Sequence, residues 1–249
     1  MAQPMTTIRG ASRQEKAVNL VLCLLVLAVG WFYFFSQFLS VDAPVRHGLK
    51  ATASVLFVVC CLCNVVFAHR VAGNRQIRLY QGILLAGQAF ACAGDIVLNY
   101  DFTGGAALFA VGHVLFLAAF FAVQRPRPRD LVLAAVIVAG AVCLLTFYPR
   151  FSFGSVKIVV YVYAVIISCM LAKGISVALT KELDSRFRLT VLLGTLLFFL
   201  SDLMLVFHQF ANGGRLFDFF CLLLYYPAEC FLALSVLASR RLGARRENA

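Results

Sequence analysis

The sequence predicts an all-α membrane protein with eight spanning helices, forming one integral membrane domain over residues 1–249. Three observations support this fold class. Of the 249 residues, 62% are hydrophobic and only 13% are charged, whereas about a quarter of the residues in soluble domains are charged. The apolar residues fall into blocks close to the length of about 20 residues that a helix needs to cross a bilayer. These blocks show little alternation of period two, which favours helices over a membrane barrel.

The eight apolar blocks follow one another with short connections that leave no room for a soluble domain. In chain order, we expect helices at residues 17–39, 48–68, 77–99, 104–124, 130–148, 155–179, 187–210 and 215–239. The first block is longer than the hydrophobic stretch of a typical secretory signal, and no clear small-residue cleavage site follows it. We therefore interpret it as the first membrane helix.

The basic residues are distributed unevenly between the two ends of the predicted helices. The net charge of +11 would suit a nucleic-acid partner, but the positions argue against one. Sixteen of the 22 basic residues share one side: Arg9, Arg13, Lys16, Arg70, Arg75, Arg78, Arg125, Arg127, Arg129, Lys181, Arg186, Arg188, Arg240, Arg241, Arg245 and Arg246. The positive-inside rule then places both termini in the cytoplasm. This topology is typical of a bacterial inner membrane and of the endoplasmic reticulum membrane.

The nine cysteines lie mostly inside the apolar blocks. The C-C-x-C stretch at 60–63 has no second cluster of Cys or His to complete a metal site. We expect the cysteines to pack as small hydrophobic residues, without a disulfide or zinc.

Two segments of the chain resemble each other. The stretch LLAGQAFACAGDIVL (84–98) aligns with LLGTLLFFLSDLML (192–205) at a shift of 107 residues, which places Asp95 on Asp202 and Gly87 on Gly194. Both stretches belong to odd-numbered helices, so they run in the same direction. This relationship suggests a parallel four-plus-four repeat of the kind known in membrane folds.

Several polar side chains fall inside the predicted membrane helices, where an ionisable group costs about 2.5–3.5 kcal/mol near the bilayer centre. The main candidates are Lys50, Asp95, His113, Lys157, Asp202, Tyr225, Tyr226 and Glu229. The predicted topology brings most of them to one layer in the outer half of the bundle. Most also have a structural alternative: the aspartates as polar groups that bond helices together, the histidine and Glu229 as interhelical hydrogen-bonding groups, the tyrosines as packing aromatics, and Lys157 as a snorkelling cation.

Two carboxylates in one apolar pocket can take different protonation states, which supplies an acid and a base together. Asp95 and Asp202 are the candidates for this pair. The same pair could carry a proton through a transporter. We do not expect a metal site, because the chain has only four histidines, no H-x-x-x-H motif and no Glu beside a histidine pair.

Four motifs occur in order along the predicted helices: GDIVL (94–98), GHVLF (112–116), SDLML (201–205) and YYPAE (225–229). Their combination on an eight-helix chain resembles the YhhN family of membrane lysoplasmalogenases. The family pattern usually ends in Gln, where this chain has Glu229. The resemblance covers nearly the whole chain.

The resemblance implies hydrolysis of the vinyl ether bond of a lysoplasmalogen, a lysophospholipid within the membrane, to a fatty aldehyde and a glycerophospho-headgroup. It requires no cofactor. Asp95 and Asp202 would be the catalytic pair, and Lys50 and Lys157 would hold the substrate phosphate. The supporting residues would be His113, Tyr225, Tyr226 and Glu229. The alternatives are a small proton-coupled membrane transporter, a metal-dependent membrane lipid hydrolase and a non-catalytic membrane scaffold.

Overall fold

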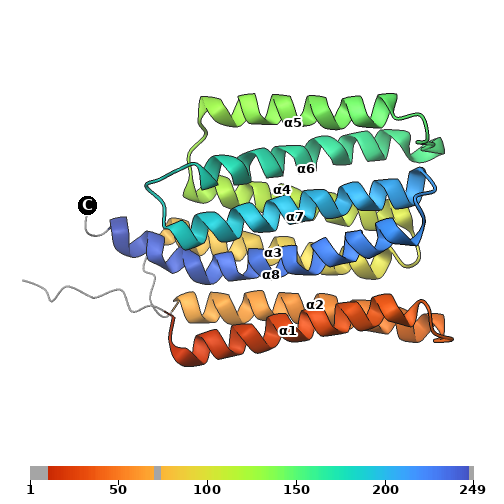
Figure 1. Cartoon of the computed structure of the whole chain (residues 1–249). Helices are drawn as coiled ribbons and strands as arrows, with labels where there is room; N and C mark the ends of the chain where they lie inside the picture. The colour runs from red at the N-terminus through yellow and green to blue at the C-terminus, as the bar shows by residue number, and fades with distance from the viewer. Residues whose placement is uncertain (1–10, 70–73, 247–249) are drawn as a thin grey trace, which may run out of the picture.

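The protein is a bundle of long helices that lie side by side (Figure 1). The computed structural model describes residues 11–69 and 74–246, with side chains as far as residue 242. Within these residues there are eight α-helices, one short 3₁₀ helix and no strand. The helices are α1 (Arg13–Ser36), α2 (Ala43–His69), α3 (Arg75–Val97), α4 (Phe102–Val123), α5 (Pro128–Phe147), α6 (Lys157–Ala178), α7 (Ser185–Phe210) and α8 (Gly214–Arg246), with η1 (Gly154–Val156) before α6.

Several helices start at a capping residue whose side chain accepts a hydrogen bond from a free backbone N–H of the first turn. Ser12 caps α1 and forms a capping box with Glu15. Asp101 caps α4 by accepting from the backbone N–H groups of residues 103 and 104, and Asp184 caps α7 in the same way. These caps fix the residues at which the helices begin.

Seven of the eight helices are long and apolar enough to cross a membrane, and α3 is the exception. Part of its polarity comes from side chains that face α8. Gln81 Nε2 donates to Ser239 Oγ at 2.9 Å, and Gln88 Nε2 donates to the backbone oxygen of Glu229 at 2.9 Å. Helix α3 lies alongside the other helices in the bundle (Figure 1). Its composition does not identify it as a membrane span, so the eighth crossing stays a prediction.

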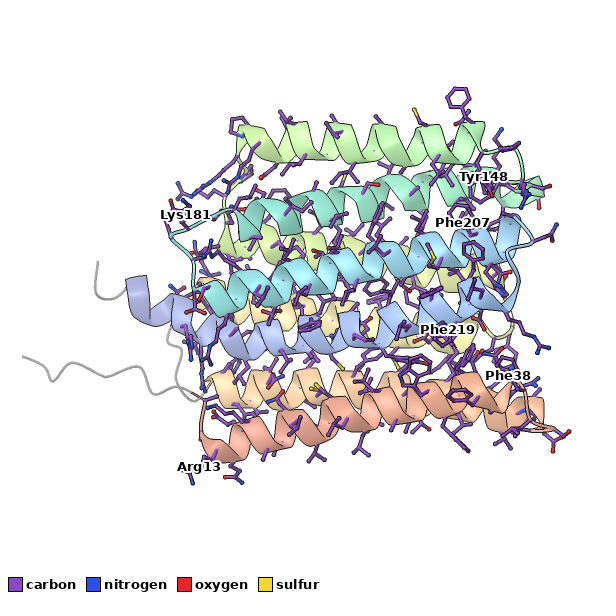
Figure 2. All side chains as sticks on the ribbon, viewed as in Figure 1. Arg13, Phe38, Tyr148, Lys181, Phe207 and Phe219 are labelled. Carbon is purple, nitrogen blue, oxygen red and sulfur yellow. The ribbon has the colours of Figure 1, made fainter. Side chains whose placement is uncertain are left out.

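The two ends of the bundle differ in side-chain chemistry. Figure 2 shows Arg13 and Lys181 at one end and Tyr148, Phe207 and Phe219 toward the other. The ring of Tyr148 lies 5.2 Å from that of Phe207, and such aromatic groups are typical of a membrane–water interface. Helix α1 begins and α8 ends at the basic end (Figure 1). Of the sixteen basic residues, Arg9 and Arg70 lie outside the described residues, as do the side chains of Arg245 and Arg246.

Helix packing largely follows a shift of four helices. The pairs α1–α2, α2–α3, α3–α4 and α2–α8 each have a counterpart, namely α5–α6, α6–α7, α7–α8 and α6–α4. A side chain at Gly87 would collide with Phe116 of α4, and one at Gly194 would collide with Leu232 of α8. Two features break the pattern. Helix α1 packs on both α2 and α8 whereas α5 packs mainly on α6, and the α3–α8 contact has no comparable counterpart between α7 and α4. This arrangement is what a four-plus-four repeat would produce, and the repeat itself stays a prediction.

Candidate active site

A polar cavity of about 260 Å³ lies near the ends of α3 and α7, and both candidate acids line it. Asn99 and Phe102 line it where α3 gives way to α4, and residues 208–210 line it at the end of α7. Asp95 and Asp202 are only 2% and 8% exposed, and both residues line this cavity. The structure therefore brings together the two acids that lie 107 residues apart in the sequence.

Asp95 is held by three donors. Ser54 Oγ and Tyr225 OH donate to its Oδ2 at 2.6 and 2.7 Å, and Lys50 Nζ lies 3.4 Å from Oδ1. Lys50 and Ser54 are four residues apart on α2, so both face α3. Two hydroxyl donors and an ammonium are the partners of an ionised carboxylate in a site of low dielectric constant.

Asp202 has different partners. Tyr163 OH donates to its Oδ2 at 2.5 Å, and His113 Nε2 lies 3.2 Å from the same oxygen and 2.8 Å from the tyrosine hydroxyl oxygen. Since the tyrosine gives its proton to the carboxylate, the histidine faces two acceptors, which assigns a proton to Nε2. Among the described residues, Oδ1 of Asp202 has no hydrogen-bond partner. This free oxygen can exchange a proton with a molecule in the cavity.

The surroundings of the two acids are related by the same four-helix shift. Each acid contacts the second helix of its own half and the last helix of the other half: Asp95 contacts α2 and α8, and Asp202 contacts α6 and α4. The lysines break this symmetry. Lys157 is the counterpart of Lys50 at a shift of 107, but it is exposed, with its Nζ 5.9 Å from the centre of the Tyr161 ring. Of the two candidate acids, only Asp95 therefore has an ammonium partner among the described residues.

An aromatic wall connects the two carboxylates. The ring centre of Phe198 lies 4.6 Å from that of His113 and 5.3 Å from that of Tyr225. The ring centre of Phe109 lies 6.1 Å from that of Tyr225 and 6.4 Å from that of Phe198. These rings exclude water behind the acids, which strengthens the electrostatic interactions inside the cavity.

The remaining predicted residues lie apart from the cavity lining. Tyr226 and Glu229 are buried on α8, and their side-chain oxygens have no hydrogen-bond partner among the described residues. His113 is fully buried behind Asp202. Lys157 does not belong to the lining either, whereas Lys50 does. In the part of the chain that the structure describes, no three His, Cys, Asp or Glu side chains are grouped to hold a metal ion.

Sequence reasoning missed two residues that contact the acids directly, Tyr163 and Ser54. The sequence does hold a clue to Ser54, because this residue lies one turn after Lys50 on the same face of α2. The sequence holds no clue to Tyr163. It is one of two tyrosines within an apolar stretch, and spacing alone does not show which of them faces the core. Tyr33, Gln37 and Asp218 also line the cavity and were not predicted.

Comparison with known proteins identifies the family to which the chain is similar. The family model of the YhhN family matches residues 45–236. The chain is similar to the lysoplasmalogenase TMEM86A of Bos taurus, with 31% identity over 164 residues, which cover 63% of this chain and 66% of that protein. It is also similar to the lysoplasmalogenase TMEM86A of Homo sapiens, with 28% identity over 189 residues, which cover 72% of this chain and 75% of that protein.

The aligned part of the bovine relative is just under two thirds of its length. No solved structure matches the chain. The apolar helices and the membrane relatives make the chain an integral multi-pass membrane protein. Because the family model covers most of the chain, from before Lys50 to beyond Glu229, this protein belongs to the YhhN family.

Proposed function

We propose that this protein is a lysoplasmalogenase-like ether hydrolase, which cleaves the vinyl ether bond of a lysoplasmalogen in the membrane. The observation that carries the proposal is the shared cavity of Asp95 and Asp202, in which the two carboxylates have different partners. The names of the relatives point to the same reaction class. Hydrolysis of a vinyl ether needs a proton donor and a stabilising anion, and it does not need a nucleophilic side chain.

The partners of the acids suggest separate roles. Asp95 faces an ammonium and two hydroxyl donors, so we assign it the ionised role, in which it stabilises positive charge on the substrate. Asp202 has no ammonium partner and keeps a free oxygen at the cavity, so we assign it the role of acid. Tyr163 and His113 hold the other oxygen of Asp202 and orient the carboxyl group.

The proposed reaction begins with proton transfer. Asp202 gives a proton to the β-carbon of the vinyl ether, and the π electrons of the double bond form the new C–H bond. The resulting cation is shared by the α-carbon and the ether oxygen, within reach of the Asp95 carboxylate. Water then adds to the α-carbon and gives a proton to the Asp202 carboxylate, which restores the acid.

The hemiacetal formed in this way breaks down to the products. Its hydroxyl loses a proton, the bond to the glyceryl oxygen breaks, and that oxygen takes up a proton. The products are a fatty aldehyde and a glycerophospho-headgroup. No other reactant besides water is consumed.

The cavity also suits the headgroup of such a lipid. Lys50 lines the cavity, so its ammonium can attract the substrate phosphate while it holds Asp95. Lys157 is exposed and outside the lining, so we assign the phosphate to Lys50 alone. We further propose that all eight helices span the membrane with both termini in the cytoplasm, which would open the cavity toward the opposite face.

The test uses purified protein with a lysoplasmalogen and the matching ester-linked lysolipid. We expect aldehyde from the vinyl ether lipid and little free fatty acid from the ester lipid. Fatty acid released from the ester lipid at a comparable rate would show that the enzyme is an acyl hydrolase. The Asp95→Asn variant is the control for contaminating activity.

A further inference from the structure

A second cavity, of about 300 Å³, lies between α5, α6 and α7. Its lining is apolar over most of its length, with Ile137 and Leu144 from α5, Ile167 from α6 and Leu203 from α7. The polar lining residues are Tyr163 and Asp202. We call this space the α5–α7 groove. Its volume lies at the lower end of the range for small-molecule pockets, about 300–1,000 Å³.

The α5–α7 groove adjoins the candidate active site. Four residues line both spaces: Val160, Tyr163, Asp202 and Val206. The polar part of the groove lining therefore includes the carboxyl group to which we assign proton donation. A molecule that fills the groove places its nearest polar atoms beside that acid.

The position of α5 leaves this groove open. Only Asp130 and Leu145 of α5 are buried, and α5 packs mainly on α6. On the other side of the bundle, the corresponding helix α1 packs on both α2 and α8. Gly140 lines the groove, and a Cβ atom added there would meet no other atom within 4 Å.

We propose that the α5–α7 groove holds the single hydrocarbon chain of the lysolipid substrate, an inference that rests on the proposed function. The polar cavity has Lys50, Gln37 and Asp218 on the side of α1, α2 and α8, which suits a charged headgroup. The groove leaves the cavity on the side of α6 and α7, which suits an apolar chain. A ligand with one charged end and one chain matches both spaces.

This orientation fixes the position of the reacting bond. In a lysoplasmalogen the vinyl ether is the first part of the chain, next to the glycerol. With the chain in the groove and the headgroup near Lys50, the double bond lies at the junction lined by Tyr163 and Asp202. The geometry thus brings the β-carbon to Asp202 and the ether oxygen toward the side of Asp95.

The first test narrows the groove. Gly140→Leu adds a side chain to open space in the groove, and Gly82→Leu adds the same side chain to open space on the exposed face of α3. We expect the ratio of kcat/KM for long-chain over short-chain lysoplasmalogen to fall about tenfold in Gly140→Leu, since even one methylene changes discrimination by about 10-fold or more. Gly82→Leu should keep the wild-type ratio. An unchanged ratio in folded Gly140→Leu would place the chain elsewhere.

The second test does not depend on hydrolysis. An ester-linked lysolipid with a photoreactive diazirine in its chain is cross-linked to the wild-type protein, and the labelled peptides are identified by mass spectrometry. We expect adducts on residues 137–145 of α5 and 199–206 of α7. Adducts confined to α1 and α2 would overturn the groove proposal, even if aldehyde is released. Labelling of the groove without aldehyde release from the vinyl ether lipid would support the groove and reject the proposed reaction.

Discussion

Lys50 and Asp95 form a buried ion pair, with Nζ 3.4 Å from Oδ1, whereas Lys157, the corresponding lysine of the second half, makes no such contact with Asp202. Two acids at equivalent positions thus have unequal electrostatic surroundings. A duplicated helix pair would supply two similar carboxylates, and the loss of one ammonium contact would let them take different protonation states. This difference is the basis of the separate roles that we propose.

Replacement of either acid should remove most of the activity. Asp95→Asn and Asp202→Asn keep the size of the side chain but cannot hold or donate the proton, so we expect each to lower kcat about 10²–10⁴-fold. The kcat of the double variant should be only slightly lower than that of the less active single variant, because the two residues act as a unit. Asp101→Asn is the control, since asparagine is also a good helix cap. Wild-type turnover in either single variant would make that acid a structural residue.

Lys50 and Lys157 should differ when each is replaced. Lys50→Met leaves the buried Asp95 carboxylate without its ammonium, and breaking a buried pair in this way typically destabilises a protein by about 3–5 kcal/mol. We expect a lower thermal midpoint in detergent, which the double variant Lys50→Met with Asp95→Asn largely restores. Lys157→Met should change neither stability nor kcat/KM. Equal effects of the two single variants would argue against the asymmetry.

Tyr163 and Tyr161 form a matched pair on α6. Tyr163→Phe removes the hydroxyl that donates to Asp202, and leaving a buried acceptor without its hydrogen bond costs about 1–3 kcal/mol. We expect kcat/KM to fall roughly tenfold or more. Tyr161→Phe removes only an exposed hydrogen bond to Thr146 and should have no measurable effect. Similar kinetics for the two variants would exclude Tyr163 from the site.

The two glycines of the apparent repeat should resist substitution. A Cβ atom at Gly87 would lie 2.6 Å from the Phe116 ring, and one at Gly194 would lie 2.8 Å from the Leu232 side chain. Overpacking of this kind typically destabilises by about 1–3 kcal/mol, so Gly87→Ala and Gly194→Ala should each lower the thermal midpoint. Gly82→Ala, which meets open space, should not lower it.

Topology can be checked with reporter fusions. We expect a reporter at residue 249 to read as cytoplasmic, because the basic residues predict that side. A reporter in the connection between α7 and α8, at residue 212, should read on the opposite side. A non-cytoplasmic C-terminus would reverse the bundle and would place the cavity at the cytoplasmic face.

Much of this architecture was accessible from the sequence, because membrane helices must be long and apolar and must satisfy their own backbone. The convergence of Asp95 and Asp202 was predictable for the same reason. Both acids lie near the ends of helices that run in the same direction. Their similar depth in the bilayer could therefore be predicted from their positions along those helices. α3 was identifiable as a helix although its glutamines lower its hydropathy.

The rest depended on rotation about the helix axes, which apolar helices do not reveal. Tyr225 reaches Asp95, but Tyr226, one residue later, is rotated away and packs on Gly30. Glu229 lies one turn deeper than Tyr225, and it is buried without reaching the cavity. Lys157 sits at the start of α6, where a flexible side chain can turn outward. In each case the contact depends on which neighbouring helix packs on that face.

The hydrogen bonds between α3 and α8 set an order for biogenesis. Gln81 and Gln88 find their partners on α8, which leaves the ribosome well after α3. Until α8 is made, these amides must remain in a water-filled or translocon-lined environment, since unpaired polar groups are costly in hydrocarbon. If α3 is the eighth crossing, as we propose, it therefore enters the bilayer late, although it is made early. In a chain truncated before α8, the amides of Gln81 and Gln88 would lack these partners. Membrane quality control could then recognise α3.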